Sequence, residues 1–275
     1  MGRFMEQLPR LPTFPKKEIK AMEKTQKIKK PKMVTPYNAQ HIGNRDEQQD
    51  YFAYSDLFNK EEQKKIGMVA VLSDGMGGMS NGRKASHRAT DVFLNSYRVS
   101  KIQNIRERLV MSAQKANDAV KLLGGAGATI IVTVIKDWNL YWLSIGDSRI
   151  YLYRNGNLLR LNKEHNYESV LSDMVLRGEI SVQEAINNPN RQALTSYLGI
   201  NDLEEIDINE NDVPLCSGDS ILLCSDGLYK ALSDDEIAEI IGSADDDVCE
   251  VMVNSAMSKN IRAQDNITVM LLDID

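Results

Sequence analysis

Aspartates stand at the ends of apolar, strand-like segments at several places in the chain. Three of these segments read "VLSDG", "LLCSDG" and "AQDNITV", and they contain Asp74, Asp226 and Asp265. Two further cases are Asp50 in "QQDYFAY" and Asp147 in "SIGDSR". If these strands share one core, the carboxylates converge at the sheet ends, where repulsion and desolvation require cations to offset them. Oxygen ligands without histidine or cysteine favour Mg²⁺ or Mn²⁺ over zinc.

An ordinary turn is the simplest explanation of a single Asp-Gly pair, so the metal hypothesis rests on the recurrence of the pattern. Glycine at positions 75, 77, 78 and 82 would also let the backbone approach an ion or a phosphate closely. A Rossmann loop does not fit, because Ser80 stands where the third glycine is required. An EF-hand does not fit either, because neither Asp74 nor Asp226 is followed by the alternating ligands of such a loop.

A cysteine phosphatase is also disfavoured. It would need C-x₅-R, and the nearest candidate pairs Cys224 with Lys230 instead of an arginine. Cys224 lies in a segment that reads as a core strand, so we interpret it as a buried structural thiol.

The elements that must position the aspartates read mainly as strands. Helical spacing is found from Ile102 to Val120, and again over residues 235–241 and 246–257. Residues 140–145 and 149–153, separated only by "GDSR", are expected to pair as an antiparallel meander. Strands and helices do not alternate regularly, so we predict an α+β fold with antiparallel sheets and helices outside. The strand-like runs are Gly67–Ser73, Thr129–Ile135, Leu140–Ile145, Arg149–Tyr153, Ser220–Cys224 and Ile267–Leu272.

Charge is distributed unevenly along the chain. Residues 1–40 carry a net charge of +7 within a total of −6, which leaves −13 for the rest. Five of the seven prolines also lie there, so residues 1–36 are expected to form a flexible basic arm, and residues 37–275 the folded domain. The arm is either a solvated tail or a docking segment for an acidic partner, RNA or anionic lipid.

Composition limits the environment and the partners. The acidic balance disfavours nucleic acid as the main ligand, except through the arm. The three cysteines form no C-x-x-C pair, and no apolar run reaches the ~20 residues of a membrane helix. We therefore expect a cytoplasmic protein without a membrane span.

Taken in order, the motifs resemble the PPM family, the metal-dependent protein serine/threonine phosphatases of type 2C, and in particular its bacterial branch. The resemblance runs from Gly43 to Asp275. It includes "GNRDEQQDYF", "VLSDGMGGMSNGRKAS", "GAGATIIV", "SIGDSRIYLYRNG", "NPNRQALTSYLG", "GDSILLCSDGLY" and "QDNITVMLL". The fold that this resemblance implies is a four-layer α-β-β-α sandwich of two antiparallel sheets flanked by helices.

The resemblance also assigns roles to residues. It implies that Asp74 bridges two ions, with the carbonyl of Gly75 as a further ligand. It implies that Asp226 and Asp265 hold one ion, that Asp50 orients a water or ligates directly, and that Asp147 contributes with Asp226 to a weaker third site. Arg45 matches the arginine that grips the substrate phosphate, and its planar fork suits that task.

The implied reaction is hydrolysis of phosphoserine and phosphothreonine in proteins, opposing serine/threonine kinases. Two ions about 4 Å apart would lower the pKa of a shared water, and the resulting hydroxide would attack phosphorus directly. Met76 replaces a histidine found in eukaryotic members, which favours water as the acid. A flap over residues 166–199 is expected to set specificity, and His165 is expected to support it.

Two other functions remain open from the sequence. One is a catalytically silent scaffold of the same fold that binds phosphoproteins. The other is a switch dedicated to a single partner. The expected state of the protein is a monomer.

Overall fold

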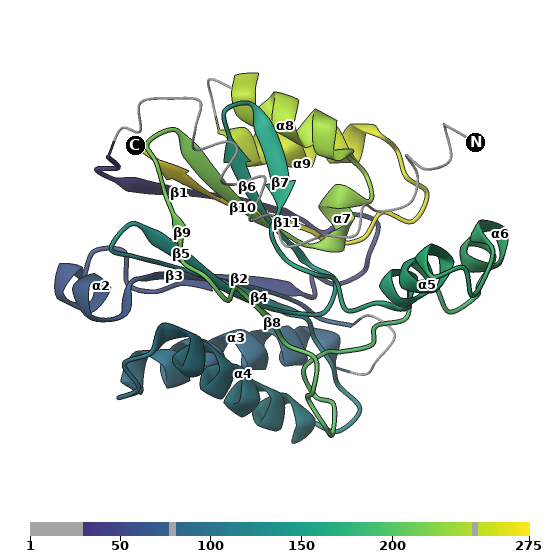
Figure 1. Cartoon of the computed structure of the whole chain (residues 1–275), viewed down its shortest axis with the longest axis horizontal. Coiled ribbons are helices and arrows are strands. Elements are labelled where there is room, and N and C mark those ends of the chain that lie inside the picture. The colour runs from purple at the N-terminus through teal and green to yellow at the C-terminus, as the bar shows by residue number, and fades with distance from the viewer. Residues whose placement is uncertain (1–29, 77–80, 244–246) are drawn as a thin grey trace.

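Two antiparallel β-sheets lie face to face in the computed structural model, which describes residues 30–76, 81–243 and 247–275 (Figure 1). The first sheet has the strand order β1 (Val34–His41), β11 (Ile267–Ile274), β10 (Asp219–Cys224), β6 (Arg149–Arg154) and β7 (Asn157–Arg160). The second has the order β2 (Asp50–Tyr54), β3 (Met68–Asp74), β4 (Ile130–Lys136), β5 (Asn139–Ile145) and β8 (Asp207–Ile208), and β9 (Val213–Pro214) also pairs with β5.

Strand β3 shows why these strands read as continuous apolar runs. Ala70 and Leu72 pack between the two sheets, whereas Val69 and Val71 pack beneath the helices on the outer face. Because both faces of the strand are covered, both sets of alternating side chains are apolar. Each fully buried Leu or Val contributes about 1.5–3 kcal/mol.

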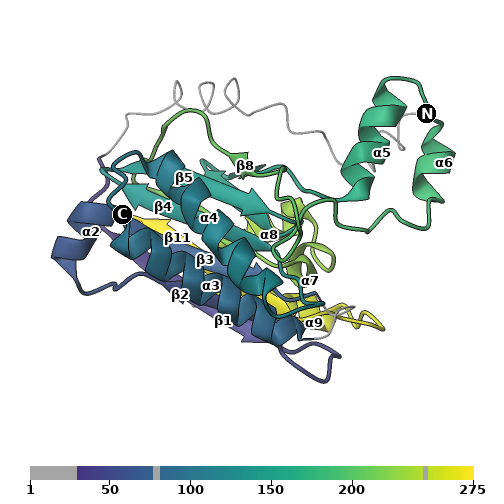
Figure 2. The ribbon, with the colours of Figure 1, turned by 90° about the horizontal axis from the view of Figure 1, so that it is seen from below.

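Helix pairs cover the outer faces of both sheets, which completes four layers (Figures 1 and 2). Helix α3 (Gly82–Val99) buries Ala85, Ala89, Phe93 and Tyr97, spaced by four residues. It lies with α4 (Ile105–Lys121) on the second sheet. Helices α8 (Asp234–Ser243) and α9 (Val248–Ser258) cover the first sheet, while α2 (Lys60–Ile66) and α7 (Asp226–Tyr229) are short.

The predicted flap forms a separate helical hairpin that projects from one end of the sandwich (Figure 2). It contains α5 (Tyr167–Leu176) and α6 (Val182–Ile186). Gly178 has φ +72°, which breaks the helical run. Ser181 then begins α6 in a capping box with Glu184, so two short helices form within the flap segment.

The expected meander of residues 140–145 and 149–153 is wrong. Strand β5 pairs with β4 in the second sheet, whereas β6 pairs with β10 and β7 in the first. The chain crosses between sheets at Gly146, whose φ is +104°, and a Cβ there would lie 2.6 Å from Thr129 Cγ2. The short break therefore changes sheets instead of making a hairpin.

The boundary of the arm also differs from the expectation. Strand β1 begins at Val34 and pairs with Ile274, so residues 34–36 belong to the first sheet. Residues 1–29, most of the predicted arm, lie outside the described part of the chain. Among the residues that the structure describes, no helix has the length and apolar character that a membrane span requires.

Candidate functional site

The sheet topology gathers the predicted aspartates at one end of the sandwich. Asp50 is the first residue of β2 and lies opposite Asp74, the last residue of β3. Asp226 follows the end of β10, and Asp265 lies just before the start of β11, the antiparallel neighbour of β10. Asp147 occupies the crossing between β5 and β6. We call these five residues the carboxylate cluster.

The cluster behaves as one electrostatic unit. Burial raises the pKa of Asp74 well above its ordinary value, and the other four carboxylates raise it further. A group of carboxylates in this state either takes up protons or binds cations. The arrangement is therefore a site for positive charge.

Asp50 joins the two sheets at the cluster. Its Oδ2 accepts hydrogen bonds from Ser225 Oγ (2.8 Å) and Thr268 Oγ1 (2.7 Å), both from the first sheet or its edge. Its Oδ1 is buried and has no hydrogen-bond partner among the residues that the structure describes. Burial raises the pKa of Asp50 to about 7, although the two hydroxyl groups oppose the shift.

Asp74 is fixed through its backbone. Its N–H donates to Thr129 Oγ1 (3.0 Å), and the Thr129 N–H donates to the Asp74 carbonyl (2.8 Å). The next residue, Gly75, must lack a side chain, because a Cβ there would lie 2.3 Å from the Gly82 carbonyl oxygen. Gly77 and Gly78, for which the sequence also predicted a close approach to an ion or phosphate, lie outside the described residues.

Asp226 and Asp265 each pair with a cation of the chain itself. Lys230 Nζ lies 2.5 Å from Asp226 Oδ2, and Arg45 Nη2 lies 2.6 Å from Asp265 Oδ2. Within the described part of the chain, Asp226 Oδ1 is buried without a hydrogen-bond partner. With these side chains turned to the two cations, the described residues contain no set of three acidic, histidine or cysteine side chains placed to chelate one ion.

Asn266 was not singled out from the sequence, yet it holds the loop that carries Arg45. Its Oδ1 accepts from the Gln49 N–H (2.8 Å), and its Nδ2 donates to the carbonyls of Ile42 (2.8 Å) and Glu47 (3.1 Å). Because Asn266 follows Asp265, one short segment positions both a cluster carboxylate and the arginine loop. The motif "QDN" contained this signal, but its targets are backbone atoms more than 200 residues away.

Asp147 and His165 lie at the base of the flap. Burial raises the pKa of Asp147 to about 7, with a further rise from Asp226, while Lys230 opposes the shift. The backbone N–H of His165 donates to the Gly146 carbonyl (2.8 Å), and the imidazole Nδ1 of His165 accepts from the Gly146 N–H (3.2 Å). Burial lowers the pKa of His165 to about 4, so it is neutral and supports the fold, as predicted.

Comparison of the sequence with models of protein families agrees with this geometry. The sequence model of the family described as "Protein phosphatase 2C" matches residues 38–264, which include every residue of the cluster except Asp265. The chain belongs to the protein phosphatase 2C family.

Curated relatives of this type 2C family member are bacterial. Serine/threonine phosphatase stp of Listeria monocytogenes is 29% identical over 231 residues, which cover 78% of this chain and 87% of the relative. Protein phosphatase PhpP of Streptococcus pneumoniae is 32% identical over 218 residues, which cover 75% of this chain and 86% of the relative. The expected likeness to the bacterial branch is confirmed.

Solved structures show the same fold. The S. agalactiae serine/threonine phosphatase superposes with a TM-score of 0.75 at 26% identity, covering 88% of this chain and all of that one. The catalytic domain of PstP, solved with two manganese ions, has a TM-score of 0.68 at 23% identity and covers 88% of this chain and 98% of its own. The predicted sandwich of two antiparallel sheets with flanking helices is thereby confirmed.

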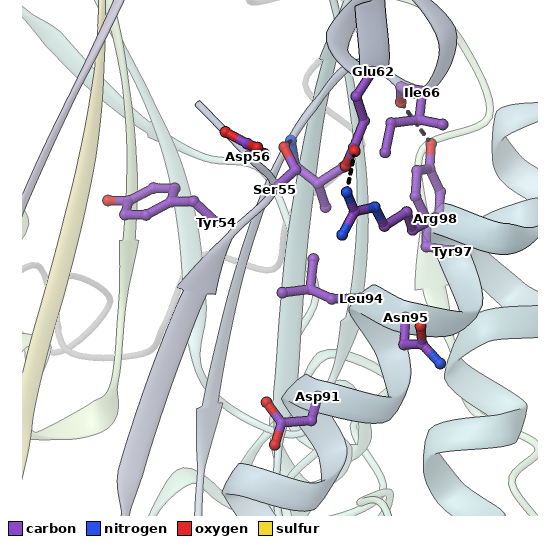
Figure 3. Close-up of a pocket in the computed structure, with 11 residues that line it drawn as sticks. Tyr54, Ser55, Asp56, Glu62, Ile66, Asp91, Leu94, Asn95, Tyr97 and Arg98 are labelled. Carbon is purple, nitrogen blue, oxygen red and sulfur yellow. Dashed lines mark hydrogen bonds and ion pairs between the residues drawn. The ribbon is translucent and has the colours of Figure 1, made fainter. Parts of the chain in front are cut away.

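A second pocket lies beside α3 (Figure 3). This cavity of about 240 Å³ is found where β2 ends and α3 approaches its own C-terminus. Arg98 reaches across it to Glu62 (2.6 Å), and Tyr97 Oη donates to the Ile66 carbonyl (3.3 Å). Its lining contains none of the five cluster aspartates, so it is not the chemical centre.

Proposed function

We propose that this chain is a metal-dependent protein phosphatase that hydrolyses phosphoserine and phosphothreonine in proteins. The observation that carries the proposal is the convergence of five strand-end aspartates beside Arg45 at one edge of a type 2C fold. Relatives named serine/threonine phosphatases support the choice of substrate class.

The residues present fit divalent ions. All candidate donors are hard oxygens, and two of them, Asp50 Oδ1 and Asp226 Oδ1, are buried with no hydrogen-bond partner in residues 30–76, 81–243 and 247–275. We assign the ions to Asp74, Asp226 and Asp265 with the Gly75 carbonyl, supported by Asp50 and Asp147. Mg²⁺ or Mn²⁺ suits such ligands, and two ions are proposed.

When bound, such ions would supply an acidified water and neutralise charge on the phosphoryl group. Asp50 is assigned to orienting the water through its free Oδ1, because its other oxygen is already held by two hydroxyls. His165 cannot donate a proton to the leaving group at neutral pH, since burial lowers its pKa to about 4. A water molecule is therefore the proposed acid.

Arg45 is assigned to the substrate phosphate. Its side chain is about half exposed, and its guanidinium already binds one oxyanion, the carboxylate of Asp265. A phosphate offers the same planar fork a stronger pair of charge-assisted hydrogen bonds. Asn266 fixes the loop beneath it, so the guanidinium stays close to the cluster.

We further propose phosphoproteins of a serine/threonine kinase as the partners, a monomeric state, and a flap over residues 166–199 that selects substrates. The cysteine pattern favours a reducing compartment, so the cytoplasm is the proposed place of action. The residues before β1 are proposed to form the basic arm.

The test is hydrolysis of a phosphothreonine peptide by the purified protein with Mn²⁺, with Mg²⁺ and after EDTA. Asp226→Asn is the test variant, and Asp118→Asn on the exposed face of α4 is its matched control. Turnover that requires metal and is lost in Asp226→Asn alone would support the proposal. Metal-bound, folded protein that binds the peptide without turnover would overturn it in favour of a silent phosphoprotein-binding scaffold.

A further inference from the structure

Lys230 presents an ammonium group to the carboxylate cluster. It follows α7 directly, four residues after Asp226, and its Nζ lies 2.5 Å from Asp226 Oδ2. Burial lowers the pKa of Lys230, but Asp226, Asp147 and Asp265 together raise it above its ordinary value. The ion pair therefore gives one member of the cluster, Asp226, a neutralising partner within the chain.

The preceding residue fixes Lys230 relative to Asp147. Tyr229 Oη donates to the Asp147 carbonyl (3.1 Å), and the Arg149 guanidinium lies 3.6 Å from the centre of the Tyr229 ring. Arg149 is itself held by an ion pair with the buried Glu164. Tyr229 is thus held between the crossing that carries Asp147 and the first residue of β6. This contact fixes the backbone position from which the Lys230 side chain extends.

Asp147 and Asp226 need a cation between them. Both residues are about 8% exposed, and the charge of Asp226 adds to the effect of burial in raising the pKa of Asp147. Buried like charges are tolerated only with a neutralising partner. Lys230 supplies that partner as part of the chain, while Asp226 Oδ1 is left free for an ion.

We propose that Lys230 takes the place of an additional divalent ion at the Asp147–Asp226 side of the cluster, so that the protein does not load the third site expected from the family resemblance. This inference rests on the proposed metal site. A tethered ammonium has a high effective concentration and cannot leave the chain, so the charge of Asp226 stays paired at every metal concentration.

The experiment counts bound ions instead of relying on turnover. EDTA-stripped protein is dialysed to equilibrium against increasing Mn²⁺, and bound manganese per chain is measured by mass spectrometry and by electron paramagnetic resonance. The variants are Lys230→Asp, Lys230→Ala and Lys230→Arg. Lys259→Ala removes another partly exposed lysine that is paired with an acid, Glu236, outside the cluster, and it serves as the matched control.

Lys230→Ala and Lys230→Asp are each expected to bind one ion more per chain than the wild type, while Lys230→Arg and Lys259→Ala match the wild type. Lys230→Ala is expected to melt at a lower temperature than the wild type in EDTA and to recover with Mn²⁺, which a lysine needed only for packing would not show. Equal ion counts in wild type and Lys230→Asp, with metal-dependent turnover intact, would overturn this inference alone. A wild type that binds no divalent ion would instead overturn the metal site on which the inference rests.

Discussion

Asp50 and Asp74 lie directly opposite each other on the paired strands β2 and β3. Like charges in such a pair destabilise a sheet, and Asp50 is the carboxylate that contributes most to the raised pKa of Asp74 after burial. The fold therefore holds two acids together at a cost in stability, which only a bound cation or proton offsets.

Replacement of Asp50 by asparagine should remove this repulsion and keep an oxygen that accepts from Ser225 and Thr268. In EDTA, Asp50→Asn should melt at a higher temperature than the wild type, by about 2–4 °C for each kcal/mol of repulsion removed. Saturating Mn²⁺ should raise the melting temperature of the wild type more than that of the variant. Calorimetry on both proteins in both conditions measures the crossover, and a variant that melts lower than the wild type in EDTA would contradict the assignment.

The pH dependence of stability has a defined sign. The pKa values of Asp50 and Asp147 are about 7 in the folded chain, above the ordinary 3.8 of an aspartate. The folded state thus binds protons that the unfolded state releases, so the metal-free protein should become more stable as the pH falls from about 8 to about 5. The melting temperature in EDTA should rise over this range, and the rise should be smaller in Asp50→Asn. A wild type and a variant with the same slope would rule out Asp50 as a titrating group.

Arg45 should act on phosphate binding and on charge in the transition state. Arg45→Ala is expected to lower kcat/KM for a phosphothreonine peptide by about 10²-fold. Arg45→Lys should recover only part of the loss, because an ammonium cannot form the planar fork. Arg83→Ala is the control. It removes an exposed cation of α3 that pairs with Glu47, a residue of the loop that carries Arg45, and its kcat/KM should stay near that of the wild type. Equal losses in both alanine variants would point to general positive charge instead of a specific grip.

Two truncations separate the arm from the sheet. A chain that begins at Lys30 keeps all of β1 and should retain its melting temperature and its turnover of a short phosphopeptide. A chain that begins at Pro36 loses Val34 and Thr35, which pair with Ile274 and Asp273, and it should melt several degrees lower. Loss of peptide turnover in the longer chain would show that the arm takes part in catalysis.

The parts of the fold that could be predicted from the sequence are those buried on both faces. The runs around β3, β4 and β10 are continuous apolar segments, and their burial left little doubt about strands. Strand β1 lacks such a run because it lies at a sheet edge, where a proline is tolerated and half of the side chains are exposed. Periodicity also does not say which sheet a strand joins, and for that reason the crossing at Gly146 was taken for a hairpin.

In the candidate site, too, residues with a local sequence signal could be predicted, and residues whose role depends on the fold could not. The aspartates could be chosen because each stands in a local motif at a strand end. Asn266 and Lys230 could not be assigned from the sequence, because their roles depend on what the fold brings next to them. Asn266 binds backbone carbonyls of a distant loop, and Lys230 pairs with Asp226 within the cluster that the two sheets assemble.

The contact between His165 and Gly146 has a consequence for regulation. Two hydrogen bonds join His165 to the residue next to Asp147, and the His165 carbonyl accepts from Thr195 on the returning side of the flap. Both ends of the flap are therefore anchored on the crossing that carries a cluster carboxylate. A protein bound to the projecting hairpin would therefore contact a segment tied to the backbone beside Asp147, without entering the carboxylate cluster.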